Sequence, residues 1–421
     1  MKIQYLGFLA VLSLSSCNGP ISSLTSSDQE STQNSIISSF SSENGFSKYM
    51  YRLPQNDAIQ DLSEDIVSRL SIGGLRDMQE IFRANQGNLS LSPASYLLAA
   101  LGFASVSDNF PVSSFGFRQD PSLDLSEMLN AWNYEYSSKI AAGAEYYSRL
   151  ESVVAFQQVG PTYRFDEAKR EALTNQYIST IVSSLDDYYK DATAFFHDEL
   201  GFTIPVPDPN LTSDAVIAYG GLKMKDYVPG GLGETMREFL GKDVPSYSFG
   251  SIYNPASLLY SHTENYEVFS FSLFATKMVI VLPGEGVAID DVDFTEAYSA
   301  FLESAEKVDA VGYVPYFHLT NLNVELTSPF VRKAAGAGPI FSKLLADDVK
   351  NDLRIGQVLQ SNDFEFNKYG VSGESITSII APGSAQPEEH EVIHLDDKRP
   401  FYAISMKDGF PMFVNRINNL R

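Results

Sequence analysis

Residues 50–421 carry helix-type and strand-type hydrophobic patterns without a break, and this constrains the fold more than any other feature. No stretch rich in Pro, Gly and Ser divides the run, and no pattern repeats at a period of about 20–50 residues. A hydrophobic content of 44% is ample for one large core. The run therefore predicts a single α+β domain over residues 51–421.

Several segments of this run have clear local signals. Apolar residues recur at helical spacing over residues 63–84. Ser92 suits a helix N-cap and Pro93 the first turn, where its missing N–H is not needed, and residues 97–104 continue as an almost wholly apolar helix that should be buried. Helical periodicity also marks residues 165–185. The expected strands are 151–159, 215–218, 277–282, and a hairpin that joins 401–404 to 412–417.

The first residues form an export signal. Lys2 is followed by an apolar run over residues 5–14, which is too short to span a bilayer but suits a signal-peptide core. The run ends in Leu-Ser-Ser-Cys, which resembles the bacterial lipobox. The resemblance implies that a signal peptide of residues 1–16 is removed and that Cys17 takes the lipid; an ordinary buried cysteine is the alternative.

The segment that follows Cys17 has a different composition. Residues 17–50 are mostly Ser, Asn, Gln and Thr, with few large apolar side chains. Such a segment buries too little surface to offset the entropy of ordering, so it predicts a flexible tether. The expected location is outside the cell, with the lipid as the attachment to the bacterial cell membrane.

The charge is strongly acidic. The chain has 30 Lys and Arg against 53 Asp and Glu, a formal net charge of −23. Such a surface repels phosphate backbones, so nucleic acid is excluded as an expected partner. A cationic partner, or solubility alone, fits the charge.

A zinc-protease signature occurs near the C-terminus. His390, Glu391 and His394 match the His-Glu-x-x-His pattern, whose spacing works when both histidines share one helix face. Two prolines bracket the segment and Val-Ile at its centre favours a strand, which would hold the two histidines about 13 Å apart. No His or Glu lies in residues 395–421, although Asp397 could serve as a third ligand. We therefore expect no metal site.

Other catalytic motifs are absent. The sequence has no Gly-x-Ser-x-Gly elbow, no phosphate-binding Gly-Lys-Ser/Thr loop and no dinucleotide fingerprint. The remaining histidines, His197, His262 and His318, are scattered. We expect no catalytic residue, no cofactor and no enzymatic activity.

A set of short motifs resembles one family in order and spacing. They are NLSLSPAS at 88–95, MVIVLPGE at 278–285, VGYVPYF at 311–317, GPIFS at 338–342, IGQVLQSNDFEFNKYG at 355–370, DKRPF at 397–401 and PMFVNRI at 411–417. Together they resemble the serpin family of serine protease inhibitors. The resemblance implies a large central mixed β-sheet, further sheets, about eight or nine helices and an exposed reactive loop.

The resemblance also implies roles for single residues. The hinge of the reactive loop would be Gly370, Val371, Ser372, Gly373, Ser375 and Thr377. The site where the central sheet opens, the shutter, would contain Ser92, Pro93, Ser95 and Gln360. Four positions depart from the family pattern: Tyr219 replaces Asn, Tyr227 replaces Trp, Gln360 replaces His and Lys368 replaces Glu. Gln360 can still donate and accept hydrogen bonds, whereas Lys368 removes an expected carboxylate.

The residues after Gly370 can enter a sheet, because side chains alternate between the two faces of a strand. One face would carry Val371, Gly373, Ser375, Thr377, Ile379 and Ala381, all small or uncharged. The other would carry Ser372, Glu374, Ile376, Ser378, Ile380 and Pro382. The only charge, Glu374, falls on the face that can stay wet, which avoids a burial cost of several kcal/mol.

Two counts locate the scissile bond differently. Counting forward from Gly370 by the family spacing gives Ser384–Ala385, whereas counting back from Pro400 gives a bond near Glu388 or Glu389. The forward count sets the length of strand that inserts. Residues 381–385 contain nothing bulky or basic, so an elastase-like or subtilisin-like serine protease is the expected target; cleavage after Glu388 or Glu389 would indicate a glutamate-specific one. Trypsin-like targets are disfavoured.

The expected function is suicide inhibition of a serine protease. Cleavage of the reactive loop would let the freed end enter the central sheet and distort the attached enzyme. The expected protein is a monomer. The hinge lacks the alanine run that the family's inhibitors favour, so a non-inhibitory surface lipoprotein, a binding or adhesion module, is the alternative.

Overall fold

The computed structural model describes residues 38–41, 47–50, 61–139, 145–174, 178–227, 231–250, 256–381 and 399–420. All of them belong to one compact unit, Ser35–Arg421. Cys17, the expected signal peptide and residues 17–37 of the expected tether lie outside the described residues. No helix in the described part is long and apolar enough to cross a membrane.

A nine-stranded sheet forms the centre of this unit. The strand order is β1-β2-β6-β5-β7-β17-β16-β15, and β4 pairs with β5 beside this path. The strands are β1 (Ser38–Ser41), β2 (Ser47–Met50), β4 (Tyr134–Lys139), β5 (Glu145–Val159), β6 (Ser179–Ser183), β7 (Ala215–Tyr227), β15 (Phe317–Glu325), β16 (Gln357–Asn367) and β17 (Gly370–Ala381). Only β5 and β6 pair in parallel; every other printed pair in this sheet is antiparallel.

Two further sheets complete the β structure. A seven-stranded sheet has the order β13-β10-β11-β12-β18-β19-β3, and a small sheet has the order β14-β9-β8. Their strands are β3 (Leu89–Leu91), β8 (Glu234–Phe239), β9 (Lys242–Phe249), β10 (Ala256–His262), β11 (Tyr266–Ser272), β12 (Lys277–Pro283), β13 (Glu306–Ala310), β14 (Gly312–Pro315), β18 (Phe401–Lys407) and β19 (Phe410–Ile417).

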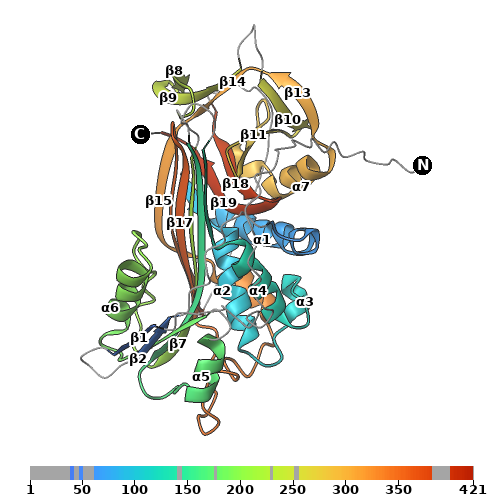
Figure 1. Cartoon of the computed structure of the whole chain (residues 1–421). Helices are drawn as coiled ribbons and strands as arrows, with labels where there is room; N and C mark the ends of the chain where they lie inside the picture. The colour runs from blue at the N-terminus through green and yellow to red at the C-terminus, as the bar shows by residue number, and fades with distance from the viewer. Residues whose placement is uncertain are drawn as a thin grey trace, which may run out of the picture. The chain divides into compact units, whose positions relative to one another are not determined.

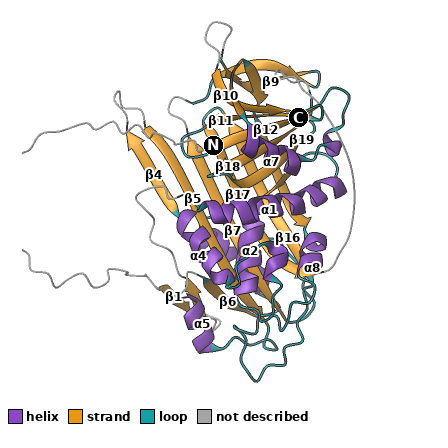
Figure 2. Cartoon of the chain, turned by 90° about the vertical axis from the view of Figure 1, so that its right-hand side faces the viewer, coloured by secondary structure: helices purple, strands orange, loops and turns teal. Residues whose placement is uncertain are grey.

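The helices pack against these sheets. They are α1 (Glu64–Ala84), α2 (Pro93–Ser105), α3 (Val112–Phe115), α4 (Pro121–Ala131), α5 (Glu167–Thr174), α6 (Tyr188–Thr193), α7 (Phe294–Ser304) and α8 (Thr327–Lys333), with a π-helix (η1, Ala194–Glu199) and a 3-10 turn (η2, Ile289–Asp291). Figure 1 shows α2 and α4 on one side of the sheet and α6 on the other. In Figure 2, α1, α2 and α4 lie in front of the strands.

Local signals explain the helices that meet the sheet. Ser63 caps α1 and accepts a hydrogen bond from the backbone of Ile66. Ser92 caps α2 in the same way, and Pro93 occupies its first turn. Nearly every residue of α2 is buried, as its apolar sequence predicts. A Cβ at Gly220 on β7 would come within 2.5 Å of the α2 backbone, so glycine lets α2 approach the sheet closely.

The sequence expectations for the α+β class, for α1 and α2, and for strands β5, β7, β12, β18 and β19 are confirmed. Two expectations are wrong. Helical periodicity over residues 165–185 covers only α5; the β-branched residues after Ile178 form β6 instead. Within the expected tether, the hairpin β1–β2 pairs with β6 through Tyr49, so ordered backbone begins before residue 51. The edge of β6 opposite β5 offers that hairpin hydrogen-bonding partners.

Candidate functional site: the loop stem and its slot in the central sheet

The residues expected to form the hinge lie inside the central sheet. β17, which we call the loop stem (Gly370–Ala381), pairs antiparallel with β16 on one edge and with β7 on the other. The register runs from Asn367↔Gly370 to Gln357↔Ala381 on one side. The gap between β7 and β16, which the loop stem fills, is called the slot below.

Burial along the loop stem follows the expected alternation at first. Val371, Gly373 and Ser375 are buried, whereas Ser372 and Glu374 are only partly buried. Further along, residues 375–379 are all buried. The face that could have stayed wet is therefore partly exposed only as far as Glu374 and is buried beyond it.

The reason for this full burial is a second apolar cluster on the outer face of the sheet. Ile376 packs there with Phe196 of the π-helix, with Phe202 and with Tyr219 of β7. Val371 and Ile379 belong to the main core on the opposite face. The loop stem therefore joins two cores, and its small side chains fit between them.

Two of the four residues expected at the shutter, Ser95 and Gln360, contact the loop stem at Thr377. The Thr377 hydroxyl lies 2.8 Å from the Ser95 hydroxyl and accepts a hydrogen bond of 2.7 Å from the Gln360 side-chain amide. Ser95 Oγ also donates to the Gly220 carbonyl at 2.9 Å. All these side chains are fully buried.

The N-cap of α2 holds the other half of these contacts. Gln360 accepts from the backbone N–H of Ser92 at 2.8 Å and donates to the Ser92 carbonyl at 2.9 Å. Ser92 Oγ donates to the carbonyl of Met412 at 2.7 Å. We call Ser92, Ser95, Gln360 and Thr377 the hydroxyl network. It links α2, β16, β19 and the loop stem, and every member is uncharged.

Two glycines of the stem are required by close contacts. Gly370 has φ +139°, and a Cβ there would lie 2.0 Å from the carbonyl oxygen of Asp226. A Cβ at Gly373 would lie 2.8 Å from the ring of Phe413. These contacts give a structural reason for glycine at both positions, and alanine in place of Gly373 would force the ring to move.

The upper end of the slot contains a residue that sequence reasoning missed. Asp226, on β7, is fully buried and its Oδ2 accepts from the N–H groups of Ala275 and Thr276 and from the Thr276 hydroxyl. Burial raises the pKa of this carboxyl, and hydrogen bonds oppose the rise. In the sequence, the only feature that could have identified Asp226 as a site residue is its position as a single Asp near the end of an apolar strand.

The departures at Lys368 and Tyr227 lie at this same end. Lys368 is exposed in the turn between β16 and β17, and its ammonium lies 3.6 Å from Glu234. Tyr227 pairs with Gly370, and its ring lies 5.9 Å from that of Tyr147. Tyr219 lies on the outer face and donates to Gln157 at 2.8 Å, away from the hydroxyl network.

Several expected site residues lie outside the described residues. They are Ser384, Ala385, Glu388 and Glu389 of the possible scissile bonds and His390, Glu391 and His394 of the zinc-like signature. In the part of the chain that the structure describes, no group of three or more His, Cys, Asp or Glu side chains could hold a metal ion.

Comparison by sequence gives no relatives: no protein-family model and no curated protein matches the chain. Comparison by structure gives many. A thermophilic serpin, tengpin, in the latent state has a TM-score of 0.63 at 14% identity, covering 86% of this chain and 100% of its own. A cleaved serpin 42Da has a TM-score of 0.61 at 15% identity, covering 85% and 97%. Thyroxine-binding globulin complexed with thyroxine has 0.60 at 13%, covering 83% and 98%.

These likenesses confirm the expected architecture at low sequence identity. The chain has the serpin fold, with a large central sheet, two smaller sheets and, in its described residues, eight α-helices.

Proposed function

We propose that this protein, which has the serpin fold, inhibits a serine protease by cleavage of its reactive loop and insertion of the loop stem into the central sheet. The observation that carries the proposal is the place of the loop stem, paired along its length with β7 and β16. Proteins of this fold are generally protease inhibitors rather than enzymes.

Strand addition supplies the driving force. The loop stem has 12 residues, and about a dozen additional backbone hydrogen bonds at about 1 kcal/mol net each give on the order of ten kcal/mol. Burial of Val371, Ile376 and Ile379 adds to this. The attached protease would be carried along with the freed end while it is still an acyl-enzyme, before water completes the reaction.

Insertion of the loop stem does not require a cut chain. The stem is about 37 Å long at about 3.4 Å per residue. The chain resumes at Arg399 and Phe401 near the Gly370 end of the stem. The Phe401 ring contacts Phe317 there, and Phe317 pairs with Phe366, which lies opposite Val371. The 17 residues between Ala381 and Arg399 can reach about 60 Å, so an intact chain can hold the stem in the slot.

A molecule whose stem is already inserted without cleavage has no free stem to insert when a protease attacks, so it cannot trap the protease. Inhibition must therefore be tested soon after refolding, on molecules whose intact loop a protease can still cleave. The chain from Asn18 onward, incubated with elastase and run on a denaturing gel, should give a complex that survives boiling. Cleavage without a complex would contradict the proposal, and chelator-sensitive proteolysis of casein would instead indicate an enzyme.

The scissile bond can be tested with one substitution. If protease attack occurs at Ser384–Ala385, Ser384→Arg should change the target from elastase to trypsin, because trypsin cleaves after basic residues. Arginine at Glu389 is the matched control at the alternative bond. Mass spectrometry of the released C-terminal peptide identifies the bond directly, and a complex with trypsin only in the Glu389→Arg variant would favour the backward count.

A second candidate function keeps the fold without inhibition. Thyroxine-binding globulin shares the fold and is described in complex with thyroxine, and the hinge here lacks an alanine run. A binding or adhesion module would be cleaved without forming a complex.

We also propose that Cys17 carries a lipid that holds the protein to the outside of a bacterial membrane. Expression of the whole chain and of Cys17→Ala in a bacterium, followed by detergent phase separation, tests this. The wild-type protein should enter the detergent phase, whereas the variant should remain in the aqueous phase; equal partition would contradict the proposal.

A further inference from the structure

The only charged side chain of the loop stem is bound by a loop that lies over the outer face of the sheet. Glu374 Oε2 accepts hydrogen bonds from the Thr203 N–H at 2.6 Å, the Thr203 hydroxyl at 3.0 Å and the Ile204 N–H at 3.3 Å. We call residues 200–204 the carboxylate-binding loop. Three donors on one carboxylate oxygen offset much of the cost of bringing the charge into the sheet.

This loop is held in place by contacts that do not involve the loop stem. Lys223 of β7 donates to the carbonyls of Leu200 and Gly201 at 3.0 and 2.9 Å. The backbone N–H of Phe202 donates to Phe196 at 2.9 Å, and the carbonyl of Ile204 lies 2.6 Å from the His197 ring nitrogen. The donors for Glu374 can therefore be in position before the stem arrives.

The cross-strand neighbours of Glu374 make these donors necessary. Glu374 pairs with Asp363 on β16, and like charges opposite each other destabilise a sheet. Lys223, its partner on β7, already lies 3.1 Å from Glu151. A cavity of about 320 Å³ adjoins Glu374, Lys223 and Thr203, so the carboxylate is not sealed off and a similar side chain can replace it.

The position of Glu374 in the stem relates this contact to the rate of insertion. The stem is tied to β16 by the two-residue turn before Gly370, so pairing starts at that end. Glu374 is the fifth residue to enter, and it reaches its donors while most of the stem is still outside. An interaction that forms early in a process changes its rate as well as its equilibrium.

We propose that Glu374 and Thr203 are positioning residues for loop insertion: the carboxylate-binding loop captures Glu374 early, sets the register of the stem and speeds its entry into the slot. This inference rests on the proposed function. It assigns a role in insertion to a loop that is 171 residues from Glu374 in the sequence.

The test measures insertion in matched variants of the chain from Asn18. The insertion rate is followed, after a single cut in the reactive loop, as the gain in resistance to thermal unfolding. Glu374→Ala should slow insertion about tenfold, since it removes bonds to a charged acceptor. Glu374→Gln, which keeps an acceptor, should slow it about threefold. Glu365→Gln, which removes a carboxylate from the neighbouring strand β16 opposite Ser372, is the control and should stay within about twofold.

A double-mutant cycle separates a direct contact from a general loss of stability. Thr203→Val removes only the hydroxyl donor and should slow insertion about threefold in the wild-type background, with no further effect in Glu374→Ala. Equal slowing by Thr203→Val in both backgrounds, or normal insertion in Glu374→Ala, would overturn the proposal.

A second readout keeps this inference distinct from the proposed function. In the uncut protein with an inserted stem, the Thr203 amide should be protected from hydrogen exchange, and Glu374→Ala should remove that protection. If the wild-type protein traps no protease, inhibition fails as a function, whereas the exchange result still decides whether Glu374 is bound by this loop. Unchanged Thr203 exchange in Glu374→Ala would refute the contact itself.

Discussion

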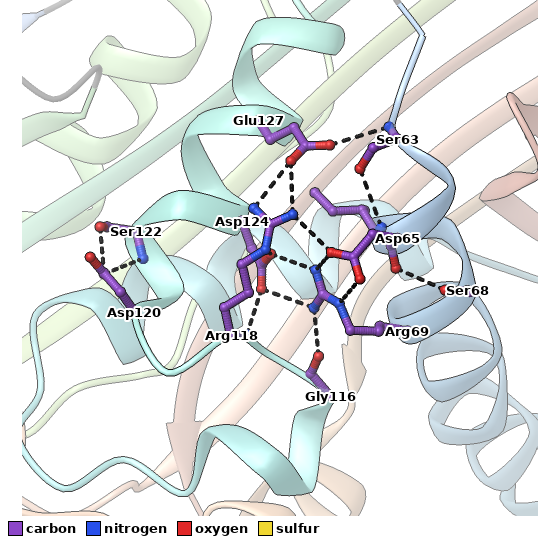
Figure 3. A network of polar contacts seen from close by, with 11 residues as sticks. Ser63, Asp65, Ser68, Arg69, Gly116, Arg118, Asp120, Ser122, Asp124 and Glu127 are labelled. Carbon is purple, nitrogen blue, oxygen red and sulfur yellow. Dashed lines mark hydrogen bonds and ion pairs between the residues drawn. The ribbon is translucent and has the colours of Figure 1, made fainter.

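Two polar networks in this protein differ in charge. The hydroxyl network of Ser92, Ser95, Gln360 and Thr377 is neutral and fully buried. The network that joins α1 to α4, which we call the charged network, consists of two arginines and three acidic residues: Arg69, Arg118, Asp65, Asp124 and Glu127 (Figure 3). Asp124 is buried at its centre, whereas the Asp65 side chain is 54% exposed.

The charges decide what each network can do. A hydroxyl or an amide both donates and accepts, so members of the hydroxyl network can exchange partners when a strand enters or leaves the slot. A guanidinium only donates and an ionised carboxylate only accepts, so no hydrogen bond of the charged network can reverse its direction. Arg69 also donates to the Gly116 carbonyl at 2.7 Å, which ties α1 to the α3–α4 segment. We infer that the hydroxyl network serves insertion, whereas the charged network keeps the helices fixed throughout it.

The largest expected effect breaks the hydroxyl network with a charge. Thr377→Arg would place an unpaired guanidinium in a fully buried position, at a cost of several kcal/mol. The loop should still be cut, but the cut protein should gain no thermal stability and form no complex with protease. Ser372→Arg, at a partly buried position of the same strand, is the control and should insert. A complex formed by Thr377→Arg would contradict the role of the slot.

The next effect concerns the charged network. Asp124→Asn should lower the free energy of unfolding by about 3 kcal/mol, since the buried carboxylate balances two arginines. Uncut and cut proteins should lose the same amount, so the stability gained on cutting should not change. Chemical denaturation of both forms measures this. Asp65→Asn, on the exposed side, should cost less; a variant that changed only the cut form would contradict the separation of the two networks.

A milder change tests the hydroxyl network without a charge. Thr377→Val keeps the shape but removes contacts with Ser95 and Gln360, and should destabilise the inserted form by about 2 kcal/mol. The same variant should leave the form with an exposed loop almost unchanged. Denaturation of both forms gives the difference, and equal losses in the two would show that Thr377 does not act through insertion.

The smallest effect is a difference in acid sensitivity. Hydrogen bonds from Arg69, and then from Arg118, lower the pKa of Asp65. Burial raises the pKa of Glu127, but hydrogen bonds from Ser63 and Arg118 outweigh it, so that the pKa of Glu127 is also lowered. A carboxyl whose pKa is lower in the folded protein than in the unfolded chain stabilises the fold at pH values above its unfolded pKa, near 4. This stabilisation is lost as the pH falls below that pKa. The neutral network has no such dependence.

Acid titration of the variants should therefore separate the networks. As the pH falls below about 4, the difference in unfolding free energy between wild type and Asp65→Asn should shrink, because Asp65 binds a proton in the unfolded chain before it does so in the folded protein, where its pKa is lower. The difference between wild type and Thr377→Val should remain constant over the same range. A Thr377→Val difference that varied with pH as strongly would indicate that the hydroxyl network is coupled to a charged group.

Much of the fold could be predicted because its signals are local. Ser63, Ser92 and Pro93 mark helix starts through side-chain hydrogen bonds and ring geometry that need no distant partner. The alternation of small and charged residues after Gly370 predicts which face of a strand can be buried. Periodicity failed over residues 165–185, where a short helix and a strand follow one another and share apolar positions.

The candidate site could be predicted only in part. Ser95, Gln360 and Thr377 were identified as site residues, but their shared hydrogen bonds join segments up to 282 residues apart. Glu374 was recognised as the only charge of the stem, whereas its partner Thr203 lies 171 residues away in a loop with no motif. Ile376 lies on the face that could have stayed wet, and apolar residues of α6 and the π-helix bury it.

The sequence by itself determined the helix caps, the strand patterns and a stem with one charge, Glu374, that can pass into a sheet. Only the tertiary structure decided that this stem lies between β7 and β16, that glycine is required at position 373 by the Phe413 ring, and that Thr203 binds Glu374. The physical reason is range: caps and alternation depend on neighbours in the chain, whereas close packing and hydrogen bonds between distant segments depend on how the whole core closes.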